Sequence, residues 1–133
     1  RLLEPIRAGK ADLVLGVRQE IPYFSERFIR ALVSLVLPCS DASTGMVAIK
    51  RSLLARMPLR GDCPCGTLVL EAYGLGARIA EVPIVVRPRR YGRRRVKTRH
   101  VRQTFFVLLD MGITIARRRA YRLKTRISRK TCL

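Results

Sequence analysis

The sequence contains few of the residues on which several common kinds of site depend. Of its 133 residues one is histidine, nine are acidic, and aromatic residues make up 6%. The four cysteines include one C-P-C but no pair of C-x-x-C motifs. A closed structural zinc site is therefore not expected. We interpret the cysteines as reduced thiols of an intracellular protein.

Long apolar runs and targeting signals are also absent. No run of about 18 apolar residues occurs, so the sequence predicts no membrane-spanning helix. The first residues show no basic start followed by an apolar stretch, so a signal peptide is not expected. Leu2, Leu3 and Ile6 followed by Gly9 resemble the last turns of a helix, which suggests that the sequence begins inside an element.

Positive charge, in contrast, is abundant and unevenly distributed. The 28 Lys and Arg residues give a formal net charge of +19. Residues 1–86 carry 11 basic and 8 acidic residues (net +3), whereas residues 87–133 carry 17 basic residues and only Asp110 (net +16). This imbalance indicates a polyanionic partner, which could be nucleic acid, anionic lipid or a phosphate-bearing substrate.

Short apolar segments between turn residues predict alternating strands and helices, and hence an α/β layer fold. Pro83 suggests that the last strand is an edge strand or contains a bulge. Ser25 and Thr67 are the expected N-caps of two helices. The expected strands are 12–17, 46–49 and 78–86, and the expected helices are 25–36, 52–57 and 67–74.

The basic C-terminal third divides into a loop and a long helix. The loop, 87–97, is either a patch for nucleic acid or lipid, or a segment that closes over phosphates. The helix is expected from about Val101 to Arg122, and its apolar part, 104–116, is about 20 Å long. Flanking arginines favour a helix in the interface of an anionic membrane, and the alternative is a core helix packed on another segment. We therefore expect one domain at 1–98 and an amphipathic helix and tail at 99–133.

Several polar residues stand where ligands are commonly bound. Arg18 ends a predicted strand, and ligands of open α/β sheets bind near strand ends. Arg30 and Ser34 are four apart on a predicted helix, so both can contact one anion. Asp41 and Gly45 suit a tight turn, and the same turn could offer a carboxylate and N–H groups to a ligand.

Some of these residues belong to longer motifs that occur in a fairly specific order. The motifs are Ala11-Asp-Leu-Val-Leu-Gly-Val-Arg18, Asp41-x-x-Thr44-Gly45 with Ala48-Ile-Lys-Arg51, Gly76-Ala-Arg-Ile-Ala-Glu-Val-Pro-Ile84 and Arg89-Arg-Tyr-Gly-Arg-Arg-Arg95. Between about Leu2 and Val96 the chain thus resembles the family-2 glycosyltransferases, most closely the dolichyl- or polyprenyl-phosphate sugar synthases. That family has a D-x-x-[ST]-G turn in its active site and an R-x-Y-G-x-S-K loop.

The resemblance implies a fold, a reaction and a set of site residues. The fold would be the C-terminal half of a Rossmann-like mixed sheet with flanking helices. The complete enzyme would transfer sugar from a nucleotide sugar of the GDP-mannose or UDP-glucose class to dolichyl or polyprenyl phosphate. It would act as a peripheral protein at the cytoplasmic face of a membrane. The implied catalytic residues are Asp41 and Arg89, the acceptor-phosphate ligands are Arg18, Arg30 and Ser34, and the sugar- or donor-binding residues are Thr44, Gly45, Glu71, Tyr91, Gly92 and Arg95.

Two departures from the family pattern limit what this chain is expected to do. Arg94 and Arg95 stand where the family loop has Ser and Lys. The family's nucleotide-binding half and its D-x-D metal motif have no counterpart here, so Mg²⁺ or Mn²⁺ is expected only in the complete enzyme. We therefore assign no metal ligand in this chain and expect it to be inactive alone. The alternatives are a basic RNA-binding protein of ribosomal type, for which stacking aromatic residues are few, and a membrane-surface adaptor.

Overall fold

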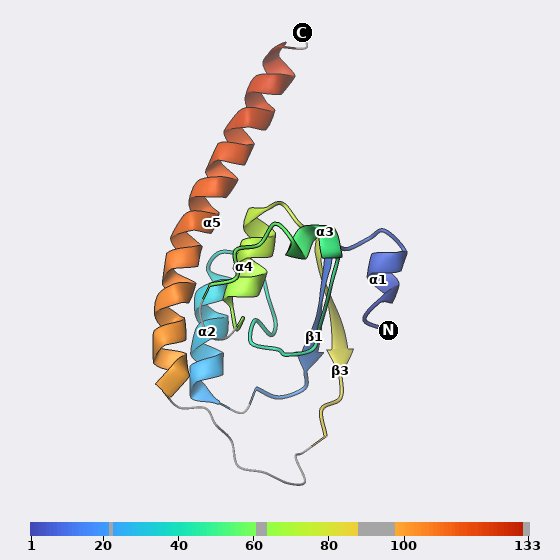
Figure 1. Cartoon of the computed structure of the whole chain (residues 1–133), viewed down its shortest axis with the longest axis vertical. Coiled ribbons are helices and arrows are strands. Elements are labelled where there is room, and N and C mark those ends of the chain that lie inside the picture. The colour runs from blue at the N-terminus through green and yellow to red at the C-terminus, as the bar shows by residue number, and fades with distance from the viewer. Residues whose placement is uncertain (22, 61–63, 88–97, 132–133) are drawn as a thin grey trace.

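The computed structural model describes residues 1–21, 23–60, 64–87 and 98–131, and the side chains of the last helix at 102–120. Helices and strands alternate as expected, so the mixed α/β class is confirmed (Figure 1). The elements are α1 (Glu4–Arg7), β1 (Leu13–Arg18), α2 (Phe24–Ser34), β2 (Val47–Ile49), α3 (Arg51–Leu54), α4 (Thr67–Gly74), β3 (Ile79–Ile84) and α5 (Thr98–Thr131).

The strands form a mixed sheet in the order β2-β1-β3. β1 pairs antiparallel with β2, where Leu13 lies opposite Ile49, and parallel with β3, where Leu13 lies opposite Ile79. In the part of the chain that the structure describes, β3 is an outer strand, which suits Pro83 because proline lacks an N–H donor. The carboxyl ends of β1 and β3 therefore meet at one edge of the sheet.

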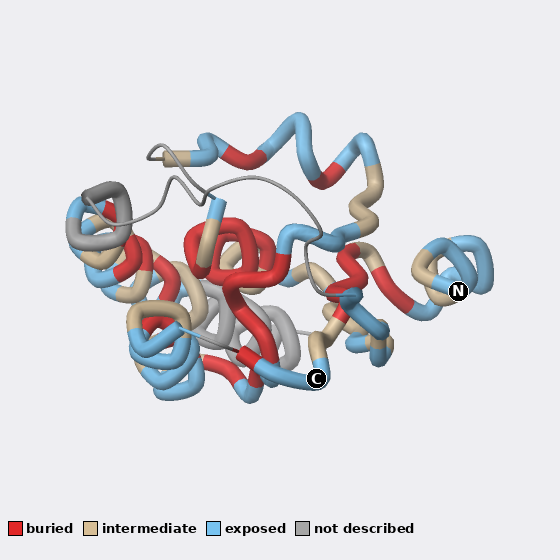
Figure 2. The backbone as a smooth tube through the Cα atoms, turned by 90° about the horizontal axis from the view of Figure 1, so that it is seen from below, coloured by how far each residue is buried: buried red, intermediate tan, exposed pale blue. Residues whose placement is uncertain are grey.

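The hydrophobic core lies between the sheet and the helices. Leu13 and Leu15, alternate residues of β1, pack in one buried cluster with Ile29 and Val33 of α2 and Leu70 of α4. In Figure 2 the buried part of the chain gathers around β1 and α4. The short element β1 is thus held in place from both the sheet and the helical layer.

The helix α5 begins earlier and ends later than expected, and it contacts α4 and α2 (Figure 1). On its inner face Val107 is buried in the core, and the Thr114 hydroxyl donates a hydrogen bond to the Leu70 carbonyl at 3.0 Å. Several of its apolar side chains remain exposed. α5 therefore packs on the body of the protein with one side. On its other sides it exposes apolar side chains, among them Phe105, Leu108, Leu109 and Ile115.

Neither of the expected side-chain caps forms. Tyr23 is the N-cap of α2, so Ser25 lies in the first turn of the helix rather than before it. Gly66 is the N-cap of α4, and Thr67 is the first helical residue. Neither N-cap residue makes a side-chain hydrogen bond to its helix. Both caps were therefore placed one or two residues too late in the sequence.

The cysteines differ from expectation at one position. Cys65 is disulfide-bonded, so the prediction of reduced thiols is wrong there. Cys39 is a free, buried thiol. Burial, together with the nearby carboxylate of Glu81, raises the pKa of Cys39 to about 12, so this thiol stays protonated at neutral pH.

Candidate functional site

Two of the sequence motifs meet at the carboxyl edge of the sheet. Arg18 is the last residue of β1, and Asp41 lies in the loop between α2 and β2. The Arg18 guanidinium donates from Nε to Asp41 Oδ2 at 2.6 Å and from Nη2 to Asp41 Oδ1 at 2.9 Å. The Asp41 side chain is fully buried and that of Arg18 is nearly so. This bidentate, charge-assisted pair fixes the D-x-x-T-G turn to the end of β1.

The same guanidinium joins a third element to this pair. Arg18 Nη1 lies 3.0 Å from Glu26 Oε2 of α2, and Nη2 also donates to the Ser43 hydroxyl at 3.0 Å. Ser43 in turn donates its backbone N–H and its hydroxyl to Asp41 Oδ1. The sequence interpretation missed Glu26 and Ser43. The available signals were weak: a serine two residues after an Asp, and an acid in the first turn of a helix.

Both members of the central pair are charged at neutral pH. Burial raises the pKa of Asp41, but the hydrogen bonds and charge of Arg18 outweigh it, so that pKa lies below its ordinary value. The hydrogen bond to Asp41 raises the pKa of Arg18. Arg18 therefore faces two carboxylates, and an incoming phosphate would have to compete with both of them for this guanidinium.

The other expected site residues of the turn and of α2 form no ion pairs among the described residues. The buried Thr44 accepts a hydrogen bond from the Met46 N–H at 3.2 Å, and Gly45 is exposed. Arg30 and Ser34 are both exposed on α2, and the Ser34 hydroxyl donates to the Arg30 carbonyl oxygen at 2.8 Å. Among the described residues, the Arg30 side chain has no ion pair. Arg30 is thus an exposed cation of this region that can meet a ligand, as is Arg27, whose Nε donates to the Ile21 carbonyl.

Glu71 belongs to a different polar cluster, between α4 and α5. Its Oε2 accepts from the Leu59 N–H at 3.1 Å, and Arg60 Nη1 lies 2.8 Å from Asp110 Oδ1 of α5. Among the described residues, Glu71 Oε1 and Asp110 Oδ2 are buried without a hydrogen-bond partner. Burial raises the pKa of both carboxyl groups. Glu71 therefore joins α4 to the loop between α3 and α4 rather than lining the Arg18–Asp41 edge.

Replacing Glu71 with glutamine is expected to stabilise the protein at pH 7. Because the folded-state pKa of Glu71 is raised, stability falls as pH rises from the ordinary carboxyl pKa through that raised value. Glutamine keeps an oxygen for the Leu59 N–H and carries no charge. We expect a gain of about 1 kcal/mol, or roughly 3–5 °C in Tm, that disappears near pH 4.

Calorimetry at pH 7 and pH 4 measures this change, and Glu20→Gln, at an exposed position, is the control. An equal gain at both pH values would contradict a charge effect at Glu71. An equal gain in the control would assign the effect to net charge instead.

The other expected site residues, Arg89, Tyr91, Gly92 and Arg95, lie outside the described residues. In the ranges that are described, no three His, Cys, Asp or Glu side chains form a group suited to a metal ion. No described helix is both long enough and apolar enough to span a bilayer. Comparisons with protein-family models, curated proteins and solved structures give no match for this chain.

Proposed function

We propose that this chain is the acceptor-side part of a family-2 glycosyltransferase that transfers a sugar from a nucleotide sugar to dolichyl or polyprenyl phosphate. One observation supports the proposal most: the segments that carry the resemblance and are described by the structure, which are all but 89–95, form one unit. β1 and β3 are parallel neighbours, and Asp41 of the turn pairs with Arg18 where β1 ends. Ligands of open α/β sheets bind at such carboxyl edges.

The proposed chemistry is a displacement at the sugar. An oxygen of the acceptor phosphate attacks the anomeric carbon, and the bond from that carbon to the nucleoside diphosphate breaks. Arg30 binds the acceptor phosphate, while the buried Arg18–Asp41 pair holds the D-x-x-T-G turn at the end of β1, so Asp41 is a positioning residue. The arginines of the loop 89–95 neutralise the departing diphosphate. The described residues group no carboxylates for Mg²⁺ or Mn²⁺, so no step is assigned to a metal in this chain.

Exposed apolar side chains on the helices suit a lipid acceptor. Phe24, Phe28 and Leu35 are spaced by four and seven residues along α2 and its end, and are 84%, 46% and 77% exposed. Residues at these spacings share one helix face. Phe105 of the neighbouring α5 is also exposed, and α2 carries the exposed Arg27 and Arg30 on its other sides. Exposed apolar side chains and cations on one helix match the interface of an anionic membrane, which is the proposed peripheral location.

The test is binding of the chain to vesicles that carry the acceptor. We expect it to float with phosphatidylcholine vesicles containing undecaprenyl phosphate more than with vesicles containing the uncharged alcohol undecaprenol. Arg30→Gln should weaken this preference about 10- to 100-fold, because a charge-assisted contact to phosphate is lost. Arg7→Gln, on the exposed face of α1, is the matched control and should leave the preference unchanged.

Two results would contradict the proposal. Equal flotation with both kinds of vesicle would show that the phosphate is not recognised. Equal weakening by Arg30→Gln and Arg7→Gln would show only general attraction between a cationic protein and an anionic surface.

A further inference from the structure

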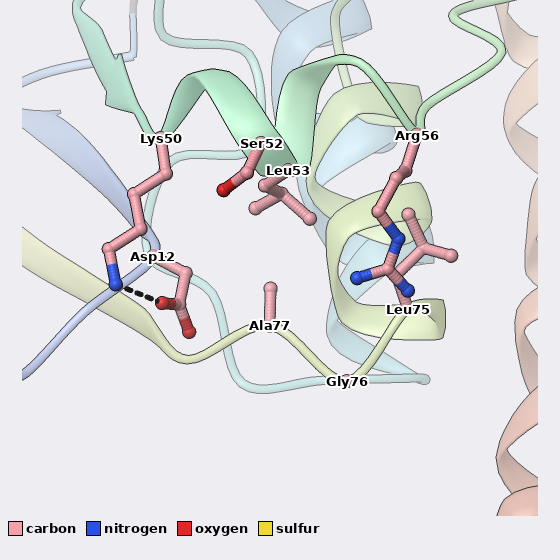
Figure 3. Close-up of a pocket in the computed structure, with 8 residues that line it drawn as sticks. All are labelled: Asp12, Lys50, Ser52, Leu53, Arg56, Leu75, Gly76 and Ala77. Carbon is pink, nitrogen blue, oxygen red and sulfur yellow. Dashed lines mark hydrogen bonds and ion pairs between the residues drawn. The ribbon is translucent and has the colours of Figure 1, made fainter.

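A cavity of about 190 Å³ lies at the amino ends of β1 and β3 (Figure 3). It is about 20 Å along β1 from Arg18, since Asp12 and Arg18 are six residues apart in an extended strand. The cavity is therefore separate from the proposed acceptor site. Its polar lining comes from Asp12, Lys50, Ser52 and Arg56, and part of its apolar wall from Leu53 and Leu75.

Asp12 is already saturated by cations. Its carboxylate accepts hydrogen bonds from Lys50 Nζ at 2.7 Å and from Arg78 Nε and Nη2 at 3.0 and 3.1 Å. The Arg78 backbone N–H adds a fourth at 3.0 Å. The hydrogen bonds from Arg78, and next those from Lys50, hold the pKa of Asp12 well below its usual range. One negative charge therefore stands against two positive charges here.

Two further side chains that line the cavity, Ser52 and Arg56, carry hydrogen-bond donors. Figure 3 shows the Ser52 hydroxyl pointing into the cavity and the Arg56 guanidinium on the opposite side of it. Within the described part of the chain, the side chains of Ser52 and Arg56 make no hydrogen bond or ion pair. The residues that line the cavity include two cations, Lys50 and Arg56, and one acid, Asp12, so the lining carries one positive charge in excess. Arg78, which does not line the cavity, neutralises Asp12 from outside it.

We propose that this cavity binds a small dianion of the phosphate type, either inorganic phosphate or the phosphate group of a small ester. Arg56 offers parallel N–H donors that match two phosphate oxygens, and Ser52 and Lys50 can donate to others. The volume is below that of sites for drug-sized ligands, which limits the ligand to a phosphate with a short substituent. Because Arg78 neutralises Asp12 from outside the cavity, Lys50 and Arg56 remain to attract the two charges of the dianion. This site binds independently of the proposed glycosyl transfer.

Calorimetric titration with inorganic phosphate, at constant ionic strength in chloride, tests the proposal. Arg56→Gln should weaken phosphate binding tenfold or more, and Ser52→Ala about threefold. Arg51→Gln is the control. Arg51 lies on α3 but does not line the cavity, so its replacement should leave phosphate binding unchanged. Circular dichroism of each variant checks that it is folded. If Arg56→Gln fails to fold, the test rests on the other two variants: Ser52→Ala should bind phosphate more weakly than Arg51→Gln.

Two further arms identify the source of the phosphate and separate this site from the acceptor site. Tighter binding of glycerol 3-phosphate than of inorganic phosphate would identify an ester as the ligand, and the reverse order would identify the free ion. Either result supports the proposal. No saturable phosphate binding, or equal weakening by Arg56→Gln and Arg51→Gln, would overturn it. Weakening by Arg30→Gln but not by Arg56→Gln would overturn it while supporting the proposed acceptor site.

Discussion

Replacing Arg18 with alanine is expected to lower the free energy of unfolding by about 3–5 kcal/mol at pH 7. The substitution leaves the fully buried carboxylate of Asp41 without the guanidinium that neutralises it. It also removes the ion pair to Glu26 and the hydrogen bond to Ser43, so three elements lose their common contact. Urea denaturation monitored by circular dichroism measures the loss.

The size of this loss should depend on pH. The lowered pKa of Asp41 means that the pair stabilises the unaltered protein above the ordinary carboxyl pKa, and that this contribution is lost as pH falls through the folded-state value. In Arg18→Ala, burial without a cation raises the pKa of Asp41. Lowering the pH then protonates this carboxylate and removes the unpaired buried charge, so the variant loses less stability. The difference between the two proteins should therefore shrink towards pH 4.

Arg78→Ala is the matched control, because Arg78 also pairs with a carboxylate at a strand end but is largely exposed. Its removal should have a much smaller effect, since exposed ion pairs contribute little. Equal losses from the two substitutions would contradict the importance of burial at Arg18. A double variant, Arg18→Met with Asp41→Leu, should be more stable than Arg18→Ala, because the fully buried carboxylate is removed together with its cation and only that of Glu26 is left unpaired.

Local patterns were sufficient to predict the strands and the order of the elements. Residues 12–17 form a short apolar run between turn residues, and they become the central strand β1 almost as expected. β3, expected at 78–86, occupies Ile79–Ile84 and is an outer strand, as Pro83 indicates. Apolar runs and prolines act within a few residues along the chain, so the sequence shows their effect directly.

The contacts of the site depended on pairings across the chain and were only partly predictable. The motifs indicated that Arg18 and Asp41 belong to one region, but not that they neutralise each other across 23 positions. Glu71 stands in the apolar run Leu68-Val-Leu-Glu-Ala72, and these apolar neighbours were the available sequence signal that it is enclosed, as the structure shows it to be. Which partner a buried charge finds is set by packing, and periodicity does not report it.

The helix α5 shows the same limit on a larger scale. Its apolar residues lie on nearly all sides, so the sequence allowed either burial or contact with lipid. In the structure, Val107 and Thr114 pack inward, whereas Phe105 and Leu108 are exposed. Which residues of α5 are buried and which are exposed is decided by where α4 and α2 pack against it, and the sequence of α5 alone does not give this.

Gly66→Ala is expected to destabilise the protein by about 2–5 kcal/mol, because two costs add at this position. Gly66 has φ +80°, a conformation that residues with a Cβ rarely adopt. A Cβ placed there would lie 2.9 Å from the Cγ2 atoms of both Ile29 and Val107. These side chains come from α2 and α5, so Gly66 lies where the start of α4 meets the two other helices.

Gly76→Ala separates the two costs. Gly76 has φ +81°, but an added Cβ would meet nothing within 4 Å, so only the backbone cost of about 1–2 kcal/mol applies. Denaturation midpoints of the two variants, with hydrogen exchange along α5, measure the difference. Gly66→Ala should also increase exchange in the part of α5 around Val107. A loss no larger than that of Gly76→Ala, with unchanged exchange, would mean that Ile29 and Val107 move aside without cost and that α5 is not tightly packed on α2.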